Sequence, residues 1–142
     1  MLAEFRTTRH VQFAETDTAG VMHFSNYFRW MEEVEHAWFR SLGMCVIQPH
    51  ALGTVSWPRI TVSCEYLAPL RFEDEVLLHF QLVSLSEKSM THEVLFYLNG
   101  KRVARGRAKA VCCRTLEGGK FESIPIPPDI RAKMEGRGLA GA

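Results

Sequence analysis

The stretch between Asn26 and Leu42 constrains the fold of this chain more than any other. Its apolar residues recur at three- and four-residue steps, which is the spacing of one face of an α-helix. The stripe consists of Tyr27, Trp30, Met31, Val34, Trp38 and Leu42, and it widens to include Phe28 and Phe39. A helix with so broad an apolar face needs to be covered by much of the protein. We therefore expect it at the centre of the fold.

Strand-like segments lie on both sides of this helix. β-Branched and aromatic residues predict one strand before it, within residues 4–13, and four strands after it. The four later segments are Arg59 to Leu67, Glu75 to Ser84, Met90 to Leu98 and Arg102 to Arg114, and residues 43–55 read as irregular. Asn99-Gly100 is typical of a tight hairpin turn between the last two strands. This order predicts an α+β fold in which a curved antiparallel sheet of about five strands wraps one long central helix.

Length and charge narrow the class of protein. A chain of 142 residues suits one globular domain, which we expect over residues 1–135, with a disordered tail over 136–142. The net charge of +1, with basic residues spread along the chain, argues against nucleic acid or an anionic membrane as a partner. No segment resembles a signal peptide or a transmembrane helix, which predicts a cytoplasmic location. Apolar residues expected on the outer face of the sheet predict self-association.

The loop between the first strand and the helix, with the sequence FAETDTAGVMHFSNY, concentrates the chemically active side chains. A helix N-terminus offers unpaired backbone NH groups and the positive end of the helix dipole, which stabilise a developing negative charge. Asp17 precedes this terminus, and Gly20 lets the backbone turn back and approach a ligand closely. A carboxylate beside NH donors is the minimal equipment for acyl transfer. A capping turn without catalysis explains the same spacing.

Other acids and histidines near the loop admit more than one role. Glu15 can assist Asp17 or be a structural charge, and His23 can be a base or a hydrogen-bonding residue at the helix start. Together with His10 they include metal-ligand types, but their spacing matches no zinc motif, so we expect no metal and no cofactor. Glu35 lies inside the apolar arc of the helix, where burial raises its pKa or a basic side chain pairs with it.

The segment ETDTAGVMHFSNYFRWMEEVEHAWFRSLG resembles the first loop and central helix of the 4-hydroxybenzoyl-CoA thioesterase family of hot-dog proteins, where a DxDxxGxV loop precedes an NYxRW helix. The likeness is clear from residue 11 to about 43 and continues more weakly, through LAPLRFEDEVL, EKSM and IPIPPD, to about residue 130. Glu15 replaces the first aspartate of the motif and Met22 its valine. Some branches of the family have a histidine at the position of Phe24, and here it comes one residue earlier, at His23.

This resemblance implies a hot-dog fold and an acyl-CoA thioesterase that acts on a small aromatic or a short-to-medium acyl group. Asp17 matches the catalytic carboxylate of the family and the backbone NH of Phe24 its oxyanion donor, with His23 and Glu15 as further candidates. The residues expected to contact the substrate are Gly20, Tyr27, Lys88 and Ser89.

The resemblance also implies a homo-oligomer, a dimer of dimers whose active site lies between two subunits. The substrate carrier is CoA or acyl-carrier protein. Two alternatives remain open: a non-catalytic acyl-binding protein, and a hot-dog hydratase or dehydratase that uses His23 with Asp17.

Overall fold

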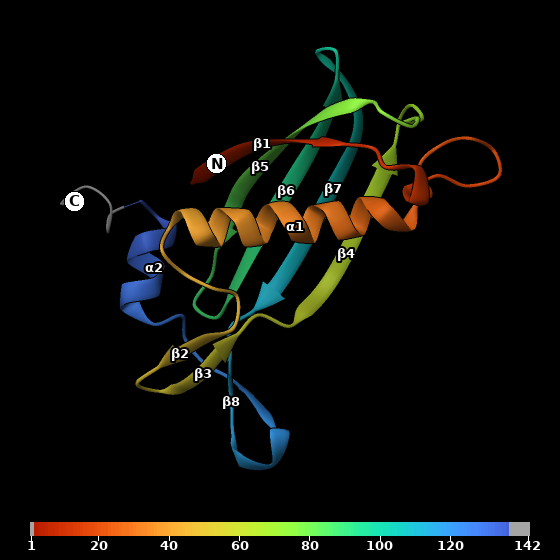
Figure 1. Cartoon of the computed structure of the whole chain (residues 1–142). Helices are drawn as coiled ribbons and strands as arrows, with labels where there is room; N and C mark the ends of the chain where they lie inside the picture. Colours follow the sequence, from red (N-terminus) through yellow and green to blue (C-terminus); the bar gives the residue numbers. More distant parts are fainter. Residues whose placement is uncertain (1, 137–142) are drawn as a thin grey trace.

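A long helix lies across one face of a curved antiparallel sheet in the computed structural model, which describes residues 2–136 (Figure 1). The first elements are β1 (Ala3–His10), the short 3-10 helix η1 (Phe13–Glu15) and α1 (Ser25–Ser41). They are followed by β2 (Gln48–His50), β3 (Gly53–Ser56), β4 (Arg59–Tyr66), β5 (Glu75–Leu85), β6 (Ser89–Leu98) and β7 (Lys101–Val111). The last elements are β8 (Cys113–Thr115), the short 3-10 helix η2 (Glu117–Gly119), β9 (Phe121–Ser123) and α2 (Pro128–Met134).

The strands form two sheets. The larger has the order β1-β5-β6-β7-β4 with every neighbouring pair antiparallel, so β1 and β4 are its two edges. The smaller has the order β2-β3-β8-β9 and lies beside the end of the larger sheet where β7 stops (Figure 1). The α+β hot-dog architecture expected from the sequence, with one long helix against five antiparallel strands, is confirmed.

The core lies between α1 and the inner face of the larger sheet. Strand β5 alternates, with Val76, Leu78, Phe80 and Leu82 buried against the helix. Strand β7 presents small residues at the matching positions, which lets α1 approach the sheet closely: Ala104, Gly106, Ala108 and Ala110. A side chain at Gly106 would overlap the thioether of Met31 on the helix. Small residues on one strand therefore set how closely the helix packs on the sheet.

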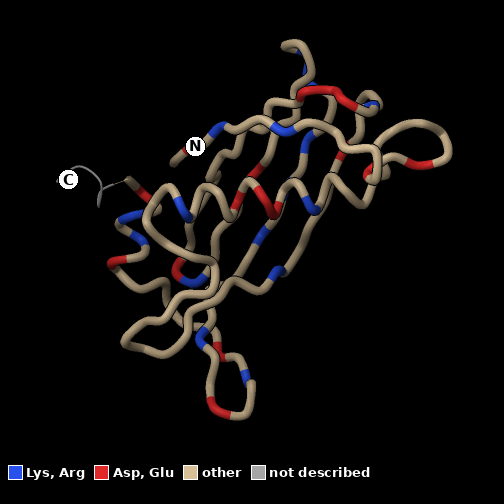
Figure 2. Tube along the Cα trace, in the orientation of Figure 1, with Lys and Arg blue, Asp and Glu red and all other residues tan. Residues whose placement is uncertain are grey.

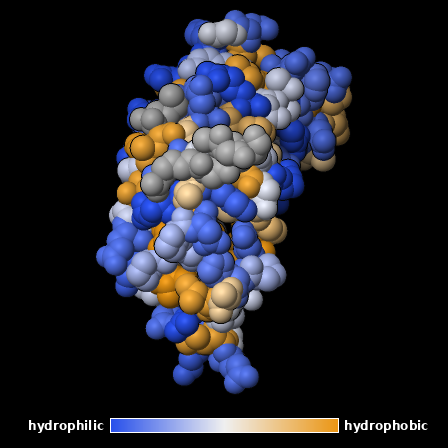
Figure 3. Space-filling model, turned by 90° about the vertical axis from the view of Figure 1, so that its left-hand side faces the viewer, coloured by the Kyte–Doolittle hydropathy of each residue, from blue (hydrophilic) through white to orange (hydrophobic). Residues whose placement is uncertain are grey.

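The outer face of the larger sheet, which looks away from α1, is less apolar than expected. Leu77, Val83 and Leu95 are on it, but so is Glu93, whose carboxylate accepts hydrogen bonds from Arg105 at 2.7 Å and from a second arginine, Arg107. Basic and acidic residues are interspersed over the fold (Figure 2), and the end that carries α2 mixes apolar and hydrophilic side chains (Figure 3). The expectation of an apolar outer face is thus confirmed only in part.

Three details of the sequence-based prediction are wrong. The first strand stops at His10, and Phe13 lies in η1 with 75% of its surface exposed. Residues 43–55, expected to be irregular, contain β2 and β3. The last predicted strand is interrupted at Cys112, whose backbone NH donates to the Lys88 carbonyl at 2.6 Å, and the chain then enters the smaller sheet as β8. Alternation cannot reveal a strand that changes sheet, because both parts keep the same period.

The predicted tail, residues 136–142, lies outside the described residues except for Gly136. Within the described part of the chain, no helix combines the length and the apolar character needed to cross a bilayer. The single domain over residues 1–135 and the cytoplasmic location stay predictions.

Candidate active site

The loop between η1 and α1 closes on itself before the helix begins. The Asp17 NH donates to the Val21 carbonyl at 2.9 Å, and the Gly20 NH donates to the Asp17 carbonyl at 2.9 Å. Gly20 has a φ of +78°, a left-handed conformation that glycine adopts without the strain of a side chain. The closed loop projects beyond the N-terminal end of α1 (Figure 1). The two hydrogen bonds therefore hold Asp17 at the base of an exposed turn.

The Asp17 carboxylate is only half used within the chain. One oxygen, Oδ1, accepts a hydrogen bond from the Ala19 NH at 2.8 Å, which fixes the side chain toward its own turn. The other oxygen accepts no hydrogen bond from residues 2–136. This half-buried carboxylate therefore has one oxygen available to take a proton from water or to attack a carbonyl carbon.

The first turn of α1 leaves one backbone donor unused. The Asn26 NH donates to the His23 carbonyl at 3.0 Å, and the Tyr27 NH donates to the Phe24 carbonyl at 3.3 Å. The Ser25 NH is directed at Nδ1 of His23, 3.3 Å away. No acceptor in the described part of the chain receives the Phe24 NH. The donor that the family resemblance assigns to the oxyanion is thus unoccupied at a helix N-terminus.

Glu15 anchors the loop. Its carboxylate accepts hydrogen bonds from both terminal nitrogens of Arg9 at 2.9 and 3.1 Å, from the Gln12 NH at 2.8 Å and from the Trp30 indole at 2.8 Å. Burial alone raises the pKa of Glu15, but the hydrogen bonds from Trp30, Gln12 and Arg9 outweigh it and hold the pKa below its ordinary value. With its oxygens already engaged, the side chain is placed for a structural role. A part in catalysis stays an untested prediction.

His23 is attached to the start of the helix. Its Nδ1 lies 2.8 Å from the Ser25 hydroxyl oxygen, and its ring stacks on the Phe24 ring with centroids 4.4 Å apart. Its backbone NH donates to the Glu15 carbonyl. A hollow of about 560 Å³ beside it is lined mostly by polar residues, Arg29 among them. The structure thus places His23 within the loop, and its catalytic role stays a prediction.

Tyr27 and Gly20 have different surroundings. Tyr27 is buried, with its ring in edge-to-face contact with that of Tyr66 at 4.8 Å between centroids. Burial raises the pKa of Tyr27 to about 12, and nearby Cys64 and Tyr66 add to the shift. Gly20 is exposed, with no atom near the position of a side chain. Sequence reasoning missed Tyr66, whose hydroxyl donates to the Phe24 carbonyl at 3.3 Å, because no pattern links a strand tyrosine to this loop.

Lys88 and Ser89 lie at the opposite end of the sheet from the loop. Because β1 and β5 are antiparallel with His10 opposite Glu75, the loop follows the end of β1 that lies beside the start of β5. Lys88 and Ser89 come after the far end of β5. The hydroxyl groups of Ser89 and Ser86 are hydrogen-bonded to each other at 2.5 Å. A single chain therefore does not bring these two predicted substrate contacts together with Asp17.

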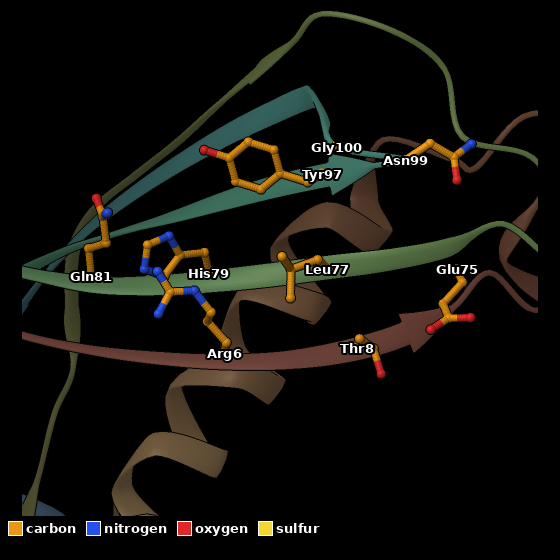
Figure 4. A pocket seen from close by; sticks show the side chains of 9 residues that line it. All are labelled: Arg6, Thr8, Glu75, Leu77, His79, Gln81, Tyr97, Asn99 and Gly100. Atoms are coloured by element: carbon orange, nitrogen blue, oxygen red, sulfur yellow. The ribbon is translucent and has the colours of Figure 1, made fainter.

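Hollows also occur on both faces of the larger sheet. One of about 660 Å³ lies on the outer face, where Arg6 and Tyr97 lie beside His79 (Figure 4). Nε2 of His79 lies 2.8 Å from the Glu4 carboxylate. This hollow is on the side of the sheet away from α1, so it is separate from the loop. Two other hollows, both apolar and of about 370 and 510 Å³, lie along α1. Glu32 and Arg59 line both of them.

Glu35 is completely buried. The sequence left open whether its pKa is raised or a basic side chain pairs with it, and both are the case. Its Oε1 accepts a hydrogen bond from Arg59 Nη2 at 2.8 Å. Burial raises its pKa, an effect that Arg59 opposes. His92 lies against the same carboxylate from β6, a neighbour that sequence reasoning missed because the two residues are far apart in the chain.

The metal-ligand types named from the sequence are not gathered together. His10 lies 3.5 Å from Glu75, and Glu15 is engaged by Arg9. Across residues 2–136, no three His, Cys, Asp or Glu side chains form a group that could hold a metal ion.

Comparison with known proteins tests the family resemblance found in the sequence. A model of the thioesterase-like superfamily matches residues 11–134. The 1,4-dihydroxy-2-naphthoyl-CoA hydrolase of Synechococcus sp. (strain WH7803) is 32% identical over an alignment of 144 positions, covering 93% of this chain and 92% of that protein. Among solved structures, a gentisyl-coenzyme A thioesterase has 28% identity and a TM-score of 0.77, with 92% of this chain and 99% of that chain covered.

A protein of Aquifex aeolicus with a solved structure is 30% identical, with a TM-score of 0.80 and coverage of 92% of this chain and 98% of that chain. The family model spans most of the chain, and the relatives align over nearly their whole length. The family resemblance found in the sequence is therefore confirmed. The chain belongs to the thioesterase-like superfamily of hot-dog proteins.

Proposed function

We propose that this protein is an acyl-CoA thioesterase that hydrolyses the thioester of an aromatic acyl group, with Asp17 and the Phe24 amide as its catalytic groups. One observation carries the proposal. Within residues 2–136, one Asp17 carboxylate oxygen accepts no hydrogen bond and the Phe24 NH has no acceptor, and both groups belong to the loop that ends at the start of α1. The names of two relatives, a dihydroxynaphthoyl-CoA hydrolase and a gentisyl-CoA thioesterase, support a thioester hydrolase and an aromatic acyl group.

The reaction follows from these two groups. Asp17 takes a proton from water as the water oxygen attacks the thioester carbonyl carbon, and the Phe24 NH stabilises the oxyanion that forms. The carbon-sulfur bond then breaks, the thiolate takes up the proton, and the free acid and the CoA thiol leave. In the alternative route, Asp17 attacks the carbonyl carbon itself and water hydrolyses the resulting anhydride. Oxygen-18 label found in Asp17 after a single turnover in labelled water would establish the second route, because only that route can place label there.

A second copy of the chain would complete the site. Strand β4 is an edge of the larger sheet, and its Ile60 is 54% exposed. The Phe24 side chain at the loop is 61% exposed, which leaves the candidate site open to water in a single chain. Pairing of two β4 edges would extend the sheet and cover both features. Lys88 and Ser89, at the far end of the sheet, would then reach a substrate only from another subunit of a dimer of dimers.

The experiment is a panel of aromatic and aliphatic acyl-CoAs in which release of free thiol is measured for the wild type and for Asp17→Asn. We expect the wild type to favour aromatic thioesters, and the variant to lose about 10²-fold or more in rate, as for loss of a general base. Asp129→Asn in α2, an exposed aspartate beside His50, is the matched control and should retain the wild-type rate. An unchanged rate in a folded Asp17→Asn protein would overturn the assignment.

The same panel, repeated with acyl-carrier-protein thioesters, tests which carrier is used. If only the carrier-protein thioester is hydrolysed, the substrate carrier is acyl-carrier protein and not CoA. Incubation with an enoyl-CoA tests the hydratase alternative. Within the described residues, His23 and Asp17 make no hydrogen bond with each other, so the geometry does not favour this alternative.

A further inference from the structure

The two apolar hollows along α1 meet at a buried polar cluster. The smaller hollow begins at Phe28, one helical turn after Phe24, and reaches Arg59 and His92. The larger shares Arg59 with it and is lined by Glu35. Arg59 is the first residue of β4, so the cluster lies on the side of α1 that faces this strand. Together the two hollows are therefore lined by Glu35, Arg59 and His92.

Two atoms of this cluster have unused hydrogen-bonding capacity. Glu35 is fully buried and His92 is 1% exposed. Oε2 of Glu35 and Nδ1 of His92 lie 3.5 Å apart, yet neither makes a hydrogen bond with any residue that the structure describes. Buried polar atoms without partners are rare, because such atoms lose their hydration and gain nothing in return. A third polar group that reached both atoms would satisfy them.

The charge state of the cluster narrows the chemistry of that group. Burial lowers the pKa of His92 to about 3, with Arg59 adding to the shift, so the imidazole is neutral near pH 7. A neutral imidazole has one NH and one acceptor nitrogen, while the carboxyl group of Glu35 accepts when ionised and donates when protonated. A hydroxyl group both donates and accepts, so it complements the pair in either arrangement. A carboxylate ligand would instead meet the buried acid itself.

The position of the cluster along the helix sets the size of the ligand. Glu35 is eleven residues after Phe24, which at 1.5 Å per residue corresponds to roughly 16 Å along the helix axis. Side chains of a helix lean toward its N-terminus, so the Glu35 carboxyl group lies a few ångströms nearer the loop than its backbone. A single benzoyl ring held at the Phe24 NH is too short to reach it. A second ring, or a chain of similar length, is needed.

We propose that Glu35, Arg59 and His92 form a subsite that binds a hydroxyl group at the far end of an extended acyl group, such as the outer ring of a hydroxynaphthoyl thioester. Arg59 holds Oε1 of Glu35, which leaves Oε2 directed to the ligand beside Nδ1 of His92. The subsite deepens the proposed function, on which it rests for the position of the thioester. Its role is to select the acyl group and not to take part in the cleavage.

The first test compares 6-hydroxy-2-naphthoyl-CoA with 2-naphthoyl-CoA as substrates of the wild-type protein. We expect kcat/KM to be about 10-fold or more higher for the hydroxylated thioester, because a site built for a hydroxyl discriminates against the analogue that leaves its polar groups unpaired. In Glu35→Gln the amide NH can donate to Nδ1 of His92, which satisfies that atom without a ligand, so the preference for the hydroxylated thioester should disappear. Glu117→Gln, an exposed position in η2, is the control and should keep the wild-type preference.

A binding measurement separates this inference from the proposed function. Calorimetric titration compares 6-hydroxy-2-naphthoate with 2-naphthoate, which bind without any thioester cleavage. Preferred binding of the hydroxylated acid, with no hydrolysis of any thioester in the acyl-CoA panel, would support the subsite and refute the thioesterase.

Equal binding of the two acids and equal turnover of the two thioesters would overturn the subsite, and the buried atoms would then be bridged by water only. A Glu35→Gln protein that keeps the full preference would overturn it as well. Should that variant fail to fold, His92→Phe and the wild-type comparison still decide the question.

Discussion

Replacing Glu15 by glutamine tests whether this acid positions the catalytic loop. Its carboxylate holds the end of β1 through Arg9, the turn through the Gln12 NH and the helix through Trp30, and it is only 12% exposed. Glutamine keeps one acceptor oxygen and brings an NH₂ group toward these donors. A hydrogen bond to a charged group contributes about 1.5–3 kcal/mol, so losing the charge and part of the network should lower the free energy of unfolding by about 2–4 kcal/mol.

Glu33→Gln is the matched control. Glu33 also accepts from Arg9, at 3.1 and 3.2 Å, but its side chain is 52% exposed. A surface pair of this kind contributes about 0–1 kcal/mol. Urea denaturation of both variants measures the difference, and equal losses in the two would refute the reasoning.

The pH dependence gives a second readout for Glu15. Its pKa is held below the ordinary value of 4.5, so the carboxylate stabilises the fold at pH values above 4.5. This contribution is lost as the pH falls through the lowered pKa of the folded state. The gap between wild type and Glu15→Gln should therefore be full at pH 7 and should close in acid. A gap that is independent of pH would show that the charge is not its source.

The rate of catalysis should also respond to the loss of the Glu15 charge. The Glu15 carbonyl accepts hydrogen bonds from the His23 NH and from the Asn26 side chain, so a shift of Glu15 moves the loop that carries Asp17. A misplacement of about 1 Å can cost about 10²-fold in rate. We expect kcat/KM for an aromatic acyl-CoA to fall in Glu15→Gln and to stay near the wild-type value in Glu33→Gln. A wild-type rate in a destabilised Glu15→Gln protein would refute the positioning role.

Two further substitutions test the packing of α1 and the proposed interface. Gly106→Ala should lower the free energy of unfolding by about 1–3 kcal/mol, because the added methyl group displaces the buried Met31 side chain, and an unchanged urea midpoint would contradict this contact. Ile60→Asp puts a charge on the exposed edge β4 and should halve the mass measured by light scattering with a parallel loss of thiol release, whereas Leu52→Asp, also exposed, should change neither. Wild-type mass for Ile60→Asp would rule out this edge as the interface.

The sequence by itself determined the elements whose signals are local. The apolar period between Asn26 and Leu42 is a property of neighbouring residues, and it identified the helix and its central place. The hairpin turn at Asn99, which has a φ of +51°, was equally local. The same holds for Asp17 as a candidate, because a loop directly before a helix N-terminus is visible in the order of residues, whereas the Phe24 NH was implied by the family resemblance.

Other features were decided only when distant segments met. Trp30 finds the acceptor that a buried indole NH needs in Glu15, fifteen residues earlier in the chain. His92 reaches Glu35 because the register of β5 and β6 turns it to the inner face of the sheet. The same antiparallel register carried Lys88 to the end of the sheet away from Asp17. Register and sheet order arise from long-range packing, so a one-dimensional pattern does not contain them.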